Sequence, residues 1–132
     1  MLGKAEVDLV RRGYDAFIAG DMEWLNQHLD ENIVWHVAGG GSLSGDVRGR
    51  EEVLAYFAKS VQVAVPEIEI HDLAAGDDHV VGVLNVTWRR PTGETFSSRA
   101  VQVFHVDGDR ALESWFVPED QAGVDAFLDA AG

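Results

Sequence analysis

Residues 79–117, HVVGVLNVTWRRPTGETFSSRAVQVFHVDGDRALESWFV, decide the fold. Two turn sequences interrupt this stretch, Pro91-Thr92-Gly93 and Asp107-Gly108. Proline, glycine and aspartate favour tight turns, because each residue supplies a backbone angle or a local hydrogen bond that the turn needs. The runs between the turns are rich in β-branched and aromatic residues, which are typical of strands. The stretch therefore predicts three strands, at 79–90, 94–106 and 111–117.

A further strand precedes this stretch. After Pro66, Ile68 and Ile70 alternate with Glu67, Glu69 and His71, and a period of two is typical of a half-buried strand. The turn sequence at 76–78 separates it from the next run. The second half of the chain is therefore expected to be a meander of four consecutive antiparallel strands.

The first half of the chain has helical spacing. In the first helix, apolar residues recur every three or four positions. Gly20 is suited to end this helix, and Asp21 is suited to cap a short second helix at 22–29. The apolar stripe is formed by Val7, Val10, Tyr14 and Phe17. The sequence further predicts a short strand at 32–37, a glycine-rich loop at 38–48, a helix at 50–61 and a short closing helix around 124–128.

This order predicts a single α+β domain over residues 1–132, because helices come first and antiparallel strands follow. A strongly curved sheet wrapped on the first helix would enclose a cone. The space where helix and sheet diverge is a natural pocket for a small molecule.

Composition restricts the partners. The chain has 23 acidic and 10 basic residues and a formal charge of −13, which makes nucleic acid and anionic membranes unfavourable partners. It has no cysteine, which excludes disulfides and thiolate sites. Charged residues interrupt the N-terminus, and no segment approaches the ~18 apolar residues of a membrane span. We therefore expect a cytoplasmic protein that does not bind a membrane.

Three segments carry a family resemblance: AFIAGDMEWLNQHLDENIVWHVAG (16–39), LSGDVRGREEVLAYF (43–57) and FHVDGDRALESWFVPEDQ (104–121). With the order of elements, they resemble the SnoaL-like, ketosteroid isomerase-like branch of the nuclear transport factor 2-like superfamily. The resemblance implies a cone of curved mixed or antiparallel sheet on three N-terminal helices, and a homodimer formed through the sheet faces. Ketosteroid isomerases, limonene epoxide hydrolases, scytalone dehydratases and polyketide cyclases share this fold, as do proteins without catalytic activity.

The resemblance also assigns positions. The general base of the isomerases falls on His36, and their two oxyanion-binding residues fall near Gly13 or Tyr14 and on Gln102, where the original residue pair is not reproduced. The acid/base aspartate of epoxide hydrolases and SnoaL-type cyclases falls on Val117. Trp115 matches the epoxide hydrolase pattern, and Asp120 lies three residues after Val117.

Three residues are therefore candidates for catalysis. His36 has a side chain that can take and return a proton near neutral pH, unless it is a core histidine with a satisfied hydrogen bond. Gln102 could hydrogen-bond a ligand carbonyl or another strand. Asp120 could reach the mouth of the pocket or cap the last helix.

Other residues are candidates for substrate binding. Glu113, Trp115 and Val117 share one face of the last strand, since side chains alternate. Glu113 could be a buried acid, an ion-pair partner of an arginine (Arg89, Arg99 or Arg110), or an outward residue at a dimer interface. The remaining candidates are aromatic and could line a pocket or simply fill the core: Tyr14, Trp35, Phe57, Trp88 and Phe104.

The glycine-rich loop, Gly39 to Gly45, lacks the ending of a phosphate-binding loop. It is expected to be a connection or a lid over the cavity. The five histidines show no metal-ligand spacing, and no metal or cofactor is expected.

Three functions remain open. The first is a cofactor-independent acid–base enzyme of the isomerase, cyclase or dehydratase type, with His36 as the proton-transfer residue and a small, mostly apolar substrate. The second is a non-catalytic binding protein for such a molecule, and the third is a dimeric structural or assembly module.

Overall fold

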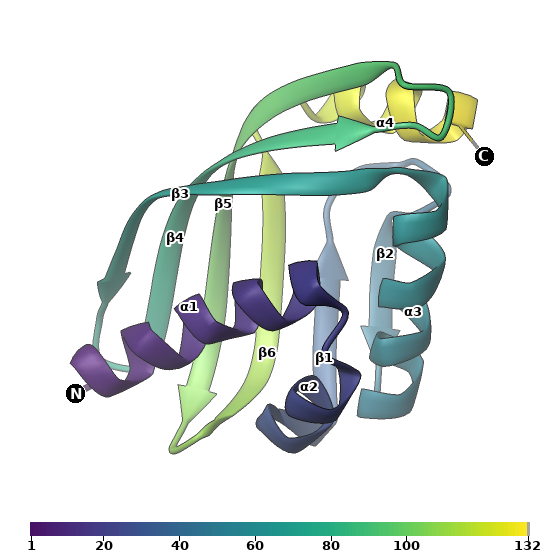
Figure 1. Ribbon diagram of the computed structural model, residues 1–132. Coiled ribbons are helices and arrows are strands. Elements are labelled where there is room, and N and C mark those ends of the chain that lie inside the picture. Colours follow the sequence, from purple (N-terminus) through teal and green to yellow (C-terminus); the bar gives the residue numbers. More distant parts are fainter. Residues whose placement is uncertain (132) are drawn as a thin grey trace.

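The computed structural model describes residues 1–131 and contains four helices and six strands (Figure 1). The elements in chain order are α1 (Lys4–Ala19), α2 (Met22–His28), β1 (Leu29–Val37), β2 (Gly45–Arg48), α3 (Arg50–Val63), β3 (Val65–Ala75), β4 (His79–Arg89), β5 (Thr95–Asp107), β6 (Arg110–Pro118) and α4 (Gln121–Ala131).

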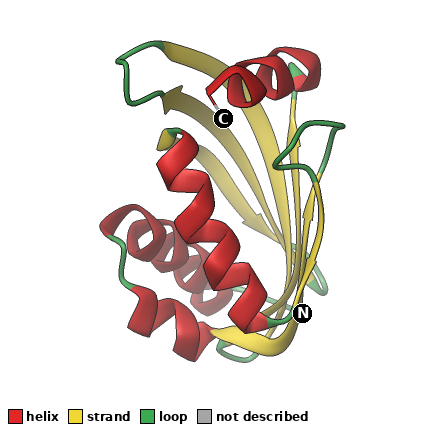
Figure 2. Cartoon of the chain, turned by 90° about the vertical axis from the view of Figure 1, so that its right-hand side faces the viewer, coloured by secondary structure: helices red, strands yellow, loops and turns green. Residues whose placement is uncertain are grey.

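The six strands form one curved, unclosed sheet in the order β2-β1-β6-β5-β4-β3. Strands β3 to β6 are consecutive antiparallel neighbours, as the turn sequences predict. Strand β1 lies parallel to β6, which makes the sheet mixed. The expected α+β architecture with a curved sheet is therefore confirmed. Figure 2 shows the helices within the concave side of the sheet.

The apolar stripe of α1 explains why this helix lies on the sheet. Val10 and Tyr14 are buried, whereas Arg11 and Arg12 on the other side of the helix are exposed. Helix α1 ends at Gly20, whose left-handed backbone (φ 71°) allows its N–H to bond back to the last turn. The Asp21 side chain then accepts a hydrogen bond from the Trp24 N–H at 3.1 Å and caps α2, as expected.

Strand β2 is a correction, because residues 45–48 were expected to be part of a loop. Four residues are too few to show a period of two, and their side chains are mostly exposed. The strand exists because β1 offers it a free edge, with Trp35 opposite Val47 and His36 opposite Asp46. Tertiary pairing, rather than local sequence, produces this strand.

Burial alternates along the central strands and separates two faces. On β5, Ala100, Gln102 and Phe104 are buried towards the helices, whereas Val101 between them is exposed on the convex side. The core lies between the concave face and α1 to α3. Its most deeply buried apolar side chains are Ile33, Val53, Val80, Leu84 and Val86.

Candidate functional site

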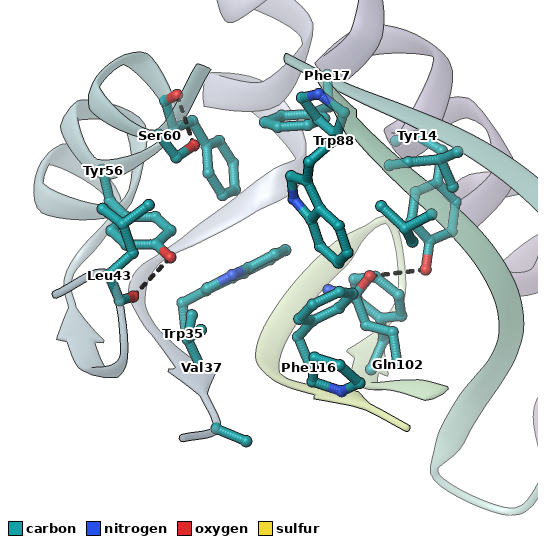
Figure 3. A pocket seen from close by; sticks show the side chains of 18 of the residues that line it. Tyr14, Phe17, Trp35, Val37, Leu43, Tyr56, Ser60, Trp88, Gln102 and Phe116 are labelled. Atoms are coloured by element: carbon teal, nitrogen blue, oxygen red, sulfur yellow. Dashed lines mark hydrogen bonds between the residues drawn. The ribbon is translucent and has the colours of Figure 1, made fainter. Parts of the chain in front are cut away.

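A cavity of about 180 Å³ lies between the concave face of the sheet and the helices. By comparison, an engineered apolar cavity of ~150 Å³ can hold benzene, so this space suits a molecule of one or two rings. Its walls are mostly apolar, and Figure 3 shows aromatic side chains from helices and strands around it. The aromatic residues that line it include Tyr14, Phe17, Trp35, Tyr56, Phe57, Trp88, Phe104 and Phe116.

A chain of neutral hydrogen bonds reaches into this apolar space (Figure 3). The Tyr14 hydroxyl donates to Oε1 of Gln102 at 2.8 Å, and Nε2 of Gln102 donates to the Ser114 hydroxyl at 3.0 Å. Tyr14 and Gln102 line the cavity, while the fully buried Ser114 holds the amide from behind. Buried polar groups without partners destabilise a protein, so the chain explains how an amide is tolerated here. It also leaves one Gln102 N–H and the Tyr14 oxygen lone pairs available to a ligand.

Gly82 makes room for this chain. It lies opposite Gln102 in the sheet, and a Cβ atom added there would be 3.3 Å from the Tyr14 hydroxyl. Burial strongly raises the pKa of Tyr14, because a phenolate would be poorly solvated in this space. Tyr14 therefore remains a neutral hydroxyl and serves as a hydrogen-bonding group, not as a base.

A second tyrosine occupies the opposite wall. The Tyr56 hydroxyl donates to the Leu43 carbonyl at 2.8 Å, and burial raises the pKa of Tyr56 to about 12. This bond ties α3 to the loop that connects β1 and β2. The Tyr56 hydroxyl therefore already donates its proton to a main-chain carbonyl and does not offer it to a ligand.

His28 is a cavity residue that sequence reasoning missed. It lies at the end of α2 and stacks on Trp24 with ring centroids 3.9 Å apart. Its Nδ1 lies 2.7 Å from the Trp24 carbonyl oxygen, so Nδ1 carries a proton and donates. In the neutral ring, Nε2 then holds the lone pair. The family resemblance had directed attention to His36 instead, and no local motif marks His28.

The glycine-rich loop and α4 form one end of the cavity. Gly41, Leu43 and Ser44 line it from the loop, and Asp125 and Asp129 line it from α4. Both carboxylates accept main-chain N–H groups of the loop, and the bond from Ser42 lowers the pKa of Asp129.

Six of the sequence-predicted site residues come together in this cavity, and they come from five elements. They are Tyr14, Trp35, Phe57, Trp88, Gln102 and Phe104.

His36 lies elsewhere, and the expectation that it faces the cavity is wrong. Its neighbours Trp35 and Val37 line the cavity, so the alternation of the strand puts His36 on the convex face. There its Nε2 is 2.5 Å from a Glu113 carboxylate oxygen, and its Nδ1 is 2.7 Å from Asp46. The hydrogen bond with Glu113, opposed by desolvation and assisted by Asp46, raises the pKa of His36.

Glu113, Trp115 and Val117 share one face, but this face is also the convex one. Ser114 and Phe116 point towards the helices instead. The last strand carries apolar residues on both faces, so its alternation does not identify the inner face. The pairing of this strand with β5 also contains a register shift, between His105 and Val106. Counting residues from the turn therefore does not identify the inner face either. Glu113 pairs with His36 and not with any of the three arginines considered.

Asp120 also lies outside the cavity lining. Its side chain accepts the Gly123 N–H at 2.9 Å, and its carbonyl accepts the Val124 N–H at 3.0 Å. It therefore caps α4, which was the structural alternative for this residue.

Residues 1–131 contain neither a cluster of metal ligands nor a membrane-spanning helix. Within this range, no three His, Cys, Asp or Glu side chains are grouped in a way that could hold a metal ion. Nor does this part of the chain contain a helix that is long and apolar enough to span a membrane.

The chain matches known proteins over nearly its whole length. A family model for the SnoaL-like domain matches residues 10–114. A protein of Mycobacterium tuberculosis (strain ATCC 25618 / H37Rv), described as uncharacterised, is 27% identical over 130 residues, with 96% of this chain and 98% of that protein covered.

Solved structures share the fold. Bal32a, from a soil-derived mobile gene cassette, is 30% identical with a TM-score of 0.83, and the match covers 92% of this chain and 94% of Bal32a. A candidate SnoaL-like polyketide cyclase from Jannaschia sp. CCS1 has a TM-score of 0.77 at 17% identity, with 92% and 90% of the two chains covered.

Proposed function

Because the chain belongs to the SnoaL-like domain family, whose fold is built around an interior cavity, we propose that it binds a small, neutral, mostly apolar molecule there. A single oxygen of this molecule meets Tyr14 and Gln102, and its flat apolar body lies among the aromatic side chains. One or two fused rings match the available volume.

The Tyr14–Gln102–Ser114 chain is the observation that carries this proposal. Its groups are neutral, and a charged ligand group beside them would lose its hydration without gaining an opposite charge. A hydroxyl or a carbonyl, in contrast, finds an acceptor in Tyr14 or a donor in Gln102. This end of the site therefore favours phenols, alcohols and ketones over carboxylic acids.

Acid–base catalysis in the same cavity is the second candidate function, and His28 is the observation that favours it. With Nδ1 donating to the Trp24 carbonyl, the free Nε2 is a proton acceptor on the cavity wall. The free N–H of Gln102 would donate to the substrate oxygen on which negative charge develops, while Tyr14 holds the Gln102 amide in place. In this reading His28 performs the proton transfer for which the sequence suggested His36.

Binding is tested with two probes of matched shape, 2-naphthol and 2-methylnaphthalene, by titration of the tryptophan fluorescence. We expect wild-type protein to bind 2-naphthol about tenfold more tightly, which corresponds to ~1.4 kcal/mol, a typical contribution of one hydrogen bond. Tyr14→Phe combined with Gln102→Leu should remove this preference, because Oε1 of Gln102 could accept the probe hydroxyl once the Tyr14 hydroxyl is gone. Tyr56→Phe is the matched control, because its hydroxyl bonds to the main chain and should leave the preference unchanged.

Two results would contradict the binding proposal. One is that wild-type protein binds neither probe. The other is that the variant Tyr14→Phe/Gln102→Leu keeps the preference for 2-naphthol, which would place the probe oxygen away from the Tyr14–Gln102 pair.

Catalysis is tested by following ketone probes such as 1-tetralone for exchange of their α-protons with deuterated solvent. An enzyme would accelerate this exchange, and His28→Gln would abolish the acceleration while His36→Gln would not. Binding without accelerated exchange in wild-type protein would favour the non-catalytic function.

We also propose that two copies of the chain associate through the convex face of the sheet. The helices cover only the concave face, and the convex face has exposed valines at its centre, with exposed fractions of 36% to 49%. His36 and Glu113 flank this patch towards one end of the strands, and Arg99 forms an ion pair with Glu119 towards the other. An apolar patch with a polar rim is suited to a twofold contact between two copies. The valines are Val81, Val83, Val101 and Val117.

A further inference from the structure

The tip of the glycine-rich loop, residues 39–42, rests on α4 through hydrogen bonds to two carboxylates. The Gly40 N–H donates to Oδ2 of Asp125 at 3.0 Å, and the Ser42 N–H donates to Oδ1 of Asp129 at 2.7 Å. The Gln121 side chain donates to the other oxygen of Asp125 at 2.8 Å. These are charge-assisted bonds, which are stronger than neutral ones.

Glycine is needed for this contact. A Cβ atom added at Gly39 would lie 2.4 Å from Nε2 of Gln121, and the backbone there has a φ of 101°. A Cβ atom added at Gly41 would lie 3.3 Å from the Cβ of Asp125. Side chains on the loop tip would push it away from α4, so the glycines allow the main chain to lie directly on the helix.

The contact closes one end of the cavity, since Gly41 lines it from the loop and both aspartates line it from α4. The loop tip is mostly exposed and is fastened there by polar contacts, whereas the other cavity walls are packed strands and helices. Its two flanks are fixed: Ala38 bonds to the Phe116 carbonyl, and the Leu43 carbonyl accepts the Tyr56 hydroxyl. A segment with polar, exposed contacts between fixed ends can open locally at low cost.

Helix α4 is held more firmly than the loop tip. The Arg90 guanidinium donates to the Phe127 carbonyl at 2.8 Å and lies 3.9 Å from the centre of the Phe127 ring. Phe127 also stacks on Phe96 from strand β5, and Asp120 caps the helix. Of these two segments, the loop tip is therefore the one with fewer packing contacts, and α4 is the packed surface on which it rests.

We propose that residues 39–42 are the gate through which a ligand enters the cavity, and that Asp125 and Asp129 are its latch. This inference rests on the proposed function, because a gate has a role only if the cavity takes a ligand. The latch bonds belong to the closed state alone, so weakening them raises the rate of opening. Entry and exit then accelerate together, while the affinity changes little.

A reversible crosslink tests the gate. The Cβ–Cβ separation of 3.3 Å at positions 41 and 125 is close to the ~3.5–4.5 Å of a disulfide, so the variant Gly41→Cys/Asp125→Cys should lock the loop when oxidised. The chain has no cysteine of its own, so the engineered pair is the only disulfide that can form within one chain, and non-reducing electrophoresis identifies any disulfide between chains. In stopped-flow measurements with 2-naphthol, association and dissociation should be at least about tenfold slower in the oxidised variant than in the reduced variant. Adding dithiothreitol should restore both rates.

A second readout does not depend on binding. Acrylamide is a small neutral quencher, and in a background with Trp24→Phe and Trp115→Phe the remaining tryptophans, Trp35 and Trp88, both line the cavity. The oxidised crosslink should lower their quenching constant several-fold relative to the reduced protein. If wild-type protein does not bind 2-naphthol, the proposed function fails, and this measurement still decides whether the gate exists.

A variant without a crosslink provides an independent check should the cysteine pair fold poorly. Asp125→Asn/Asp129→Asn keeps the shape of both side chains and removes the charge from the latch. We expect both rate constants to rise about fivefold or more, because neutral hydrogen bonds are weaker. Asp15→Asn, an exposed change on α1, is the control and should alter neither rate.

Three results would overturn the gate. Unchanged probe kinetics and acrylamide quenching in the oxidised crosslink would place the entrance elsewhere. Unchanged rates in the Asn variant would show that the aspartates are not a latch. A lower affinity through faster dissociation alone would make Asp125 and Asp129 ligand contacts.

Discussion

The Tyr14 hydroxyl and Oε1 of Gln102 are 2.8 Å apart, although 88 positions separate the two residues in the chain. This hydrogen bond joins the middle of α1 to the middle of β5, where Ser114 from β6 completes the contact. The bond holds α1 against β5 at the polar end of the cavity. One bond thus contributes to the fold and defines the polar end of the ligand site.

Replacing Gln102 by leucine should therefore destabilise the protein. The Tyr14 hydroxyl would lose its acceptor in a buried setting, which costs ~1–3 kcal/mol. Urea denaturation should show a loss of this size in the free energy of unfolding. Gln62→Leu is the control, because Gln62 is exposed on α3 and such changes typically stay within ~0.5 kcal/mol. Equal effects of the two substitutions would contradict a special role of the buried amide.

Gly82→Ala should strain the same contact from the neighbouring strand. The new methyl group would lie 3.1 Å from a Leu73 methyl carbon and 3.3 Å from the Tyr14 hydroxyl, and overpacking of this kind costs ~1–3 kcal/mol. Both the melting temperature and the affinity for 2-naphthol should fall. Gly76→Ala, in an exposed turn with a nearest contact of 3.6 Å, should leave both nearly unchanged. An unaltered melting temperature in Gly82→Ala would show that Leu73 and Tyr14 can move aside without loss of stability.

The pKa of His36 predicts a pH dependence of stability. The hydrogen bond with Glu113, together with Asp46, raises the pKa of His36 above its ordinary value of 6.5. The stabilisation is therefore fully present below pH 6.5, the value in the unfolded chain, and is lost as the pH rises through the raised value of the folded protein. Because the site is partly exposed, we expect less than ~1 kcal/mol.

Urea titrations of wild type and His36→Gln from about pH 5 to pH 9 measure this effect, since the difference between them isolates His36. The wild-type advantage should shrink as the pH rises. An advantage that grows with pH would contradict the ion-paired state of His36. Binding of 2-naphthol should be the same in both proteins, because His36 is on the convex face.

The valine patch predicts a dimer. Light scattering of wild-type protein at micromolar concentration should give twice the chain mass, and Val101→Lys should give the mass of one chain, because a lysine at the centre of the interface would be buried without a partner. Ile18→Lys, which changes an exposed apolar residue on α1, should remain dimeric. A monomeric wild type would remove the proposed interface.

The sequence predicts strands best where turns delimit them. In β4 and β5, turn residues bound each run and define the extent of each strand, although Val81, Val83 and Val101 make the convex face apolar as well. In β1 and β6, apolar side chains occur on both faces, since the convex face also carries Val117 and Trp115. Hydrophobicity then cannot distinguish inside from outside. For this reason the prediction that His36 faces the cavity is wrong, and the sequence leaves the face of Glu113 open.

Other site features depend on contacts between distant segments. His28 becomes a cavity residue only because α2 is placed beside α1 and the sheet. The latch joins residue 40 to residue 125 and residue 42 to residue 129. No local motif marks such contacts, whereas the abundance of glycine in the loop did indicate an unusual backbone.

The parallel pairing of β1 with β6 has a consequence for biosynthesis. A ribosome makes α1, α2, β1, β2 and α3 before it makes strands β3 to β6. Strand β1 finds its partner β6 only when nearly the whole chain has emerged, since Leu29 pairs with Ala111. The meander β3 to β6 can form from sequence neighbours, but its concave face stays uncovered if the first half is missing. We therefore expect N-terminal fragments that end before residue 110 to be unfolded and to depend on chaperones, and the cavity to arise in the last step of folding.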